Sequence, residues 1–158
     1  MVSAHPHNSA RFNVLLTEDR DHAPEHWTRT LPRLMQPMGI ESYVARTGEE
    51  AVELTRRIDI HAALIDWATP RDTPSATDDA GLWLLEVLGR EPKTLPMVMV
   101  NSRVLTTMQV HKFLNDALRL GAFTVVNRPV ELESLLAVIQ RVLDRHFDGA
   151  WPNRFPDS

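Results

Sequence analysis

Short apolar runs alternate along the chain with longer segments in which apolar residues recur every three or four positions. Most of the short runs are continuously apolar, which is typical of strands in a sheet that is covered on both faces. The longer segments have the spacing of amphipathic helices. The predicted strands are Asn13–Thr17, Ser42–Ala45, Ala62–Asp66, Met97–Asn101 and Phe123–Asn127.

Amphipathic helices are predicted between the strands and after the last one. The final helix is the most regular, and its stripe consists of Leu132, Leu135, Leu136, Ile139, Val142 and Leu143. Two further stripes consist of Gly81, Leu84, Leu85 and Leu88, and of Val110, Phe113, Leu114 and Ala117. Gly121 is placed to end the second of these helices, because glycine readily adopts the left-handed conformation found at helix ends.

Of the two helices nearest the N-terminus, the second is predicted from a capping motif, and the first from an apolar face that a proline interrupts. The segment Thr47–Glu50 is predicted to be a capping box that opens the helix carrying Ala51, Leu54 and Ile58. The first helix has an apolar face made by Trp27, Leu31, Leu34 and Met35. Pro32 falls inside it, and an internal proline costs a helix about 3 kcal/mol. We therefore expect a kink at Pro32 or a new turn beginning there.

This alternation of strands and helices predicts an α/β fold with a parallel sheet. The expected form is the flavodoxin-like, doubly wound, five-stranded sheet with strand order 2-1-3-4-5 and helices on both faces. In that order the first and third strands are neighbours, and ligands bind beyond the carboxyl ends of the strands.

Length and composition narrow the class of protein. The chain of 158 residues suits one domain, which we place at 11–147, with tails at 1–10 and 148–158. It has no cysteine, so disulfides and thiolate metal sites are excluded. A net charge of -4 without a basic run argues against nucleic acid as a partner. No segment is apolar over the length of a membrane span or a signal peptide, so we expect a cytoplasmic protein with no membrane partner.

Three carboxyl groups are expected to meet at one edge of the sheet. Asp66 ends the third apolar run, and Glu18 and Asp19 follow the first. Neighbouring carboxylates repel one another unless a cation or a proton neutralises them. Oxygen ligands without histidine or cysteine suit a hard cation such as Mg²⁺. The loop 70–79, which follows Asp66, has turn chemistry throughout and could border the site.

From about residue 11 to residue 147, the chain resembles the response-regulator receiver domains (CheY-like) of two-component signalling, in an atypical form. The motifs that carry the resemblance are Glu18-Asp19, Asp66 followed by Pro70, Asp79-Ala80-Gly81, the segment 47–51, the segment 120–122 and Asn127-Arg128-Pro129. Each motif is weak alone, but their order and spacing together are specific.

The resemblance implies a phosphorelay mechanism rather than an enzyme activity. Asp66 would be the phosphoacceptor, phosphorylated by a sensor histidine kinase or a phosphotransfer protein. Asp19 and Asp66 would bind Mg²⁺ directly, Glu18 partly through water, and Ala68 through its backbone carbonyl. A stand-alone receiver would act on a downstream protein. The last helix, with the fourth helix and the fifth strand, could form a homodimer face.

Three positions depart from the family pattern. Arg128 stands in place of the family's lysine, and keeps its charge with a planar group. Asn101, with Ser102 next to it, stands in place of a serine or threonine, and its amide can donate to a phosphoryl oxygen. Val125 stands where the family often has an aromatic residue that turns inward on activation.

Several alternatives remain open from the sequence. A pseudo-receiver would bind its partner regardless of phosphorylation. An aspartyl-nucleophile phosphatase would need an acid two residues after Asp66, where the chain has Ala68. Asp66 could simply cap the loop after it. His22 and His26 could bind a metal with Glu25, although surface histidines are the simpler interpretation.

Overall fold

The structure is a computed structural model, and it describes residues 12–20, 25–72, 80–101, 103–127 and 129–147. Both expected tails, 1–10 and 148–158, lie outside these ranges, as does most of the loop 70–79. The predicted domain boundaries therefore stay predictions. Within the described ranges, no helix combines the length and the apolar character needed to cross a membrane.

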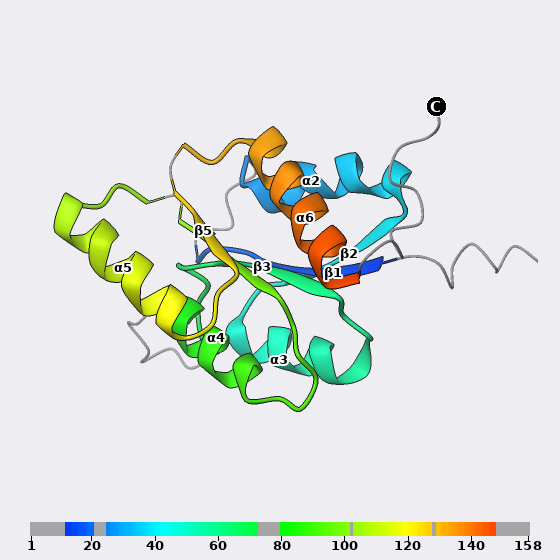
Figure 1. Cartoon of the computed structure of the whole chain (residues 1–158), viewed down its shortest axis with the longest axis horizontal. Helices are drawn as coiled ribbons and strands as arrows, with labels where there is room; N and C mark the ends of the chain where they lie inside the picture. The colour runs from blue at the N-terminus through cyan, green and yellow to red at the C-terminus, as the bar shows by residue number, and fades with distance from the viewer. Residues whose placement is uncertain (1–11, 21–24, 73–79, 102, 128, 148–158) are drawn as a thin grey trace, which may run out of the picture.

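The described residues form a five-stranded parallel sheet, and its order β2-β1-β3-β4-β5 confirms the predicted fold (Figure 1). The second strand begins two residues earlier than predicted, and the fourth ends before Asn101. The strands are β1 (Phe12–Thr17), β2 (Ile40–Ala45), β3 (Ala62–Asp66), β4 (Met97–Val100) and β5 (Thr124–Val126).

Helices cover both faces of the sheet, as predicted. The helical segments are α2 (Trp27–Met35), η1 (Gln36–Met38), α3 (Gly48–Arg57), α4 (Gly81–Gly89), α5 (Thr107–Arg119) and α6 (Leu132–Phe147). Figure 1 shows α2 and α6 on one face of the sheet and α3, α4 and α5 on the other. The helix α5 is followed by Gly121 at a φ of 102°, which confirms the predicted helix end.

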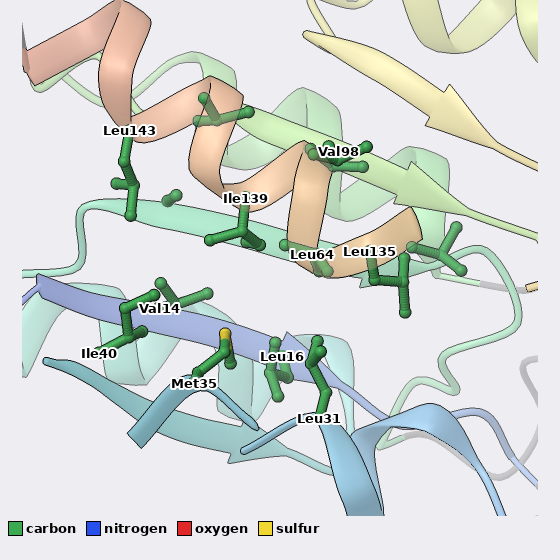
Figure 2. Close-up of a cluster of buried hydrophobic side chains, with 14 of the residues drawn as sticks. Val14, Leu16, Leu31, Met35, Ile40, Leu64, Val98, Leu135, Ile139 and Leu143 are labelled. Atoms are coloured by element: carbon green, nitrogen blue, oxygen red, sulfur yellow. The ribbon is translucent and has the colours of Figure 1, made fainter. Parts of the chain in front are cut away.

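Each face of the sheet has its own hydrophobic core, because successive side chains of a strand point to opposite faces. Val14 and Leu16 of β1 pack toward α2 and α6, whereas Leu15 between them packs toward α3 and α4. Figure 2 shows the first core, in which Leu31 and Met35 approach β1 and Ile139 approaches β3. This arrangement explains why the strands are continuously apolar.

The helix α2 passes through Pro32 without a break, so the expectation of a new turn at this residue was wrong. Trp27, Leu31 and Met35 are all buried on the face that meets the sheet. Helices in proteins are stabilised mainly by packing of an apolar face. The burial of these three side chains therefore outweighs the cost of one internal proline.

The cap of α3 differs in one bond from the predicted capping box. Thr47 Oγ1 accepts from the Glu50 backbone N–H at 3.1 Å, as predicted. The Glu50 carboxylate, however, accepts from the Arg46 backbone N–H at 2.7 Å, one residue before the cap. Both bonds satisfy backbone N–H groups at the helix N-terminus.

Gly81 brings the start of α4 against the loop that follows β3. A Cβ atom at this position would lie 2.6 Å from Trp67 Cα and 2.8 Å from the Trp67 carbonyl oxygen. These are backbone atoms, which cannot rotate away. At Gly89, the last residue of α4, the nearest atom to such a Cβ would be 3.8 Å away.

We predict that Gly81→Ala lowers the free energy of unfolding by about 1–3 kcal/mol, because the clash must displace α4 or the loop. Gly89→Ala is the matched control, and it should be neutral or stabilising by up to about 1 kcal/mol. Urea unfolding followed by circular dichroism measures both. Equal effects of the two substitutions would contradict this explanation.

His61 is half-buried at the amino end of β3. Its Nδ1 accepts from the Asn13 backbone N–H at 2.9 Å, and its ring lies against Phe12 and Phe147. Burial lowers the pKa of His61 below its ordinary value of 6.5, although Asp59 opposes the shift. The neutral ring is therefore the form that the fold stabilises.

We predict that the free energy of unfolding decreases as the pH is lowered below about 6.5. The unfolded chain then binds a proton at His61 that the folded chain does not bind. The contribution has a slope of at most about 1.4 kcal/mol per pH unit. It should disappear in His61→Gln and persist in His111→Gln, a substitution of an exposed histidine on α5. Urea unfolding between pH 5 and 7 measures the slope, and an unchanged slope in His61→Gln would contradict the assignment.

Candidate functional site

The candidate site lies at the carboxyl ends of β1, β3 and β4, where parallel strands place their last residues at one edge. Asp66 is the last residue of β3, and Glu18 and Asn101 directly follow β1 and β4. All three are buried, with 1% of Asp66, 6% of Glu18 and 2% of Asn101 exposed. Asp19 is partly exposed beside them. The structure thus brings the predicted polar residues to one edge of the sheet.

Both carboxylate oxygens of Asp66 accept hydrogen bonds from the protein. Oδ1 accepts from the Ala68 backbone N–H at 2.8 Å. Oδ2 lies 2.8 Å from His26 Nε2, and it also accepts from Trp27 Nε1 at 3.4 Å. The bond to Ala68 is the loop cap that was one of the open alternatives. A carboxylate enclosed in this way is stabilised by N–H groups of the chain itself.

His26 belongs to the site, and the expectation that it is a surface histidine was wrong. It is the N-cap of α2, and its Nδ1 lies 2.8 Å from Thr28 Oγ1 and 3.3 Å from the Thr28 backbone nitrogen, which donates to it. Since Nδ1 accepts from this N–H, we assign the proton to Nε2, which then donates to Asp66. His22 lies outside the described residues.

Two buried threonines fix the backbone beneath Asp66, and neither was predicted from the sequence. Thr17 Oγ1 accepts from the Asp66 backbone N–H at 2.8 Å. The Thr69 hydroxyl lies 2.7 Å from Thr17 Oγ1 and 2.8 Å from the Asp66 carbonyl oxygen. These contacts join the ends of β1 and β3 and orient the carboxylate. The only signal in the sequence is a polar residue at the end of an apolar strand.

The carboxylate of Glu18 is paired with arginines. Its two oxygens lie 3.7 Å from Arg29 and 3.9 Å from Arg46. Both arginine side chains are largely exposed, so each pair contributes little stability. The positive charges of the two arginines nevertheless offset the negative charge of the Glu18 carboxylate, which is itself buried.

The residues predicted to bind Mg²⁺ have suitable oxygen donors, but in this structure the carboxylates of Asp66 and Glu18 are already bonded to or paired with other side chains. Oxygen donors suit this ion, yet Asp66 Oδ2 is bonded to His26 and Trp27, and Glu18 is paired with arginines. Within the described ranges, no three acidic, histidine or cysteine side chains are grouped so that they could hold a metal. The Mg²⁺ site therefore stays a prediction that needs a rearrangement.

Asn101 links the ends of β4 and β5. Its side-chain Nδ2 donates to Asn127 Oδ1 at 3.3 Å and to the Arg103 carbonyl at 3.4 Å, and its Oδ1 accepts from the Arg103 backbone N–H at 3.0 Å. The predicted site residues Ser102 and Arg128 lie outside the described part of the chain. An open hollow of about 410 Å³ lies beside Asn101, Arg103 and Asn127 and is lined also by Val104, Leu105 and Pro129.

Val125 and Trp67 are packed on the α3, α4 and α5 side of the sheet. Both lie against that core, and the Trp67 ring stacks on Phe113 with 4.7 Å between ring centroids. The Trp67 ring therefore lies on the opposite side of the sheet from Trp27. Trp27, which the sequence suggested only as a core residue, is the tryptophan that contacts Asp66.

Known structures resemble this fold along most of its length, although no family profile matches the chain and no curated protein is significantly similar in sequence. A two-component response regulator from Clostridium difficile is 19% identical, with a TM-score of 0.67 over 88% of this chain and 100% of that one. A CheY-like receiver domain protein from Methanospirillum hungatei is 23% identical, with a TM-score of 0.64 over 85% and 95%.

The chemotaxis response regulator CheY4 of Vibrio cholerae is 20% identical, with a TM-score of 0.63 over 84% of this chain and 99% of that one. At these identities the similarity concerns the backbone. It confirms the fold that the resemblance implies. The chain has the fold of the CheY-like receiver domains of response regulators.

Proposed function

We propose that the chain is a receiver module of two-component signalling that accepts a phosphoryl group on Asp66. The position of Asp66 carries this proposal: it ends β3, in a receiver fold, between Glu18 and Asn101 on the neighbouring strands. Ligands of doubly wound sheets bind at this edge. The partner that supplies the phosphoryl group would be a sensor histidine kinase or a phosphotransfer protein.

The chemistry is a transfer between two nucleophiles. One oxygen of Asp66 attacks the phosphorus of a phosphohistidine, so that a P–O bond forms while the P–N bond breaks. The histidine nitrogen leaves with the bonding electrons. Such transfers depend on positioning and on neutralising the phosphoryl oxygens. The Ala68 backbone N–H, the Asn101 amide and the Arg128 guanidinium are the groups of this chain that we assign to that role.

Mg²⁺ remains part of the proposal. Glu18, Asp19, Asp66 and the Ala68 carbonyl would hold the ion, and the contact between His26 and Asp66 would have to open first. A bound divalent cation would supply positive charge next to the phosphoryl oxygens.

The output of the module would be a protein contact. Val104, in the loop after β4, and Met108, in the first turn of α5, are 80% and 82% exposed. Val104 also lines the hollow that Asn101 and Asn127 line. A change at Asp66 that moved Asn101 would therefore reach an apolar surface suited to a downstream protein or to a second copy of the chain.

A second candidate function is that of a pseudo-receiver, which binds its partner without phosphorylation. The observation that favours it is the hydrogen bonding of the site, since both oxygens of Asp66 and the amide of Asn101 already have partners. A site satisfied in this way is stable without any ligand.

We predict that prolonged incubation with acetyl phosphate and Mg²⁺ adds one phosphoryl group to the chain. Intact-mass spectrometry measures the adduct, and hydroxylamine should remove it because an acyl phosphate is reactive toward this nucleophile. Asp66→Asn, which keeps the size of the side chain, should give no adduct. A receiver of known competence serves as the positive control.

Absence of an adduct on the wild-type chain and on His26→Ser, which removes the imidazole from Asp66, would exclude the phosphoacceptor role if the control receiver is labelled. The pseudo-receiver would then be favoured. An adduct that persists in Asp66→Asn would move the reaction to another residue.

We also predict that Mg²⁺ shifts the backbone amide signals of Asp19, Asp66 and Ala68 in a saturable manner. Nuclear magnetic resonance spectroscopy of the labelled protein measures these shifts. Asp19→Asn should weaken the response, since it removes one anionic ligand, whereas Asp116→Asn on α5 should not. Flat signals up to high millimolar Mg²⁺ would count against the metal site.

A further inference from the structure

We propose that His26 is a gate to Asp66: its imidazole occupies the carboxylate oxygen that an incoming cation or phosphoryl donor needs. The imidazole must therefore swing away before either can bind. The part of this inference that concerns phosphoryl transfer rests on the proposed function, whereas the part that concerns a cation does not. We call the arrangement with His26 Nε2 on Asp66 Oδ2 the closed site.

In the closed site, described residues enclose the Asp66 carboxylate. The carboxylate is 1% exposed, and the His26 side chain that contacts it is 4% exposed. Trp27 adds a second, longer bond to the same oxygen. Ala68 holds the other oxygen through its backbone N–H. A ligand that needs a carboxylate oxygen must replace one of these donors, and the imidazole is the shortest contact on Oδ2.

The two buried carboxylates of the site, Glu18 and Asp66, are each stabilised by groups of the chain itself. Arg29 and Arg46 lie close to Glu18, and the imidazole donates to Asp66. Neighbouring carboxylates normally need a cation to offset their repulsion. Here the chain supplies its own donors and cations, which explains how two buried carboxylates coexist at one edge of the sheet.

His26 is placed so that it can move without unwinding a helix. It is the N-cap of α2, with extended backbone angles of φ -61° and ψ 146°, and rotation of its side chain leaves in place the bond that its backbone carbonyl accepts from the Arg29 N–H at 2.9 Å. Rotation of its side chain breaks the contacts with Thr28 and Asp66 together, since both involve the same ring. The helix itself stays anchored because Trp27 and Leu31 are buried in the core.

The substitution that tests the gate is His26→Ser. Serine can still cap α2, because its hydroxyl accepts from the backbone N–H of the first turn. Its side chain is too short to replace the imidazole at Asp66. His26→Asn, which is also a good cap, is the second variant if His26→Ser does not fold. Thermal unfolding establishes that each variant is folded.

The matched control is Trp27→Phe. This substitution removes the other side-chain donor to Oδ2 and keeps the aromatic packing, while the imidazole stays in place. A general loosening of the carboxylate would give the same result in Trp27→Phe and His26→Ser. A gate formed by the imidazole would give a clearly larger gain in His26→Ser than in Trp27→Phe.

Two measurements are made on the wild type and on each variant. Isothermal titration calorimetry with Mg²⁺ measures cation binding, and the rate of adduct formation with acetyl phosphate measures phosphoryl transfer. We expect His26→Ser to bind Mg²⁺ about tenfold or more tightly than the wild type, since a hydrogen bond to a charged group no longer competes. The adduct should also form about tenfold or more faster, while Trp27→Phe, which removes only the longer bond at 3.4 Å, should gain clearly less in both measurements.

The outcomes separate the gate from the proposed function. Tighter Mg²⁺ binding in His26→Ser without an adduct in any variant would support the gate and exclude the phosphoacceptor role. Equal adduct rates and equal Mg²⁺ affinities in the wild type and His26→Ser would overturn the gate, even if Asp66 is phosphorylated. Equal gains in His26→Ser and Trp27→Phe would also overturn it.

Discussion

The contact between His26 and Asp66 is the constraint on which the carboxyl edge of the sheet depends. A carboxylate that is 1% exposed needs hydrogen-bond donors, because burial strongly disfavours an unpaired charge. Two of the three donors come from the N-terminus of α2, forty residues earlier in the chain. The same contact therefore stabilises the charge on β3 and fixes where α2 begins on the sheet.

This dual role explains features of α2 that are unfavourable when taken alone. Histidine is not among the preferred N-cap residues, and Pro32 lies inside the helix. Both are tolerated because the helix is held by its surroundings: the cap residue is bonded to Asp66, and Leu31 and Met35 are packed in the core. Tertiary contacts have overridden local helix preferences at both positions.

The sequence predicted those features that depend on periodicity, and missed those that depend on side-chain direction. The apolar runs and stripes were sufficient for the strands and helices, since a strand covered on both faces has a distinctive composition. The strand order followed from the doubly wound form expected for five alternating units. They also located Asp66, because a carboxylate at the end of such a strand is unusual. The pairing of His26 with Asp66 and of Glu18 with Arg29 could not be predicted, since each joins residues whose separation in the chain has no fixed pattern.

The two candidate functions differ in whether a partner opens the closed site. If the contacts of His26 are together worth about 3 kcal/mol, fewer than about one molecule in a hundred is open at any moment. A small phosphodonor then meets a reactive carboxylate only rarely, and its apparent affinity falls by the same fraction. A protein partner that binds only the open form can overcome this cost, because micromolar binding corresponds to about 8 kcal/mol. A closed receiver would thus respond to its cognate kinase and resist small donors, whereas a pseudo-receiver would have a partner that recognises the closed form and leaves His26 on Asp66.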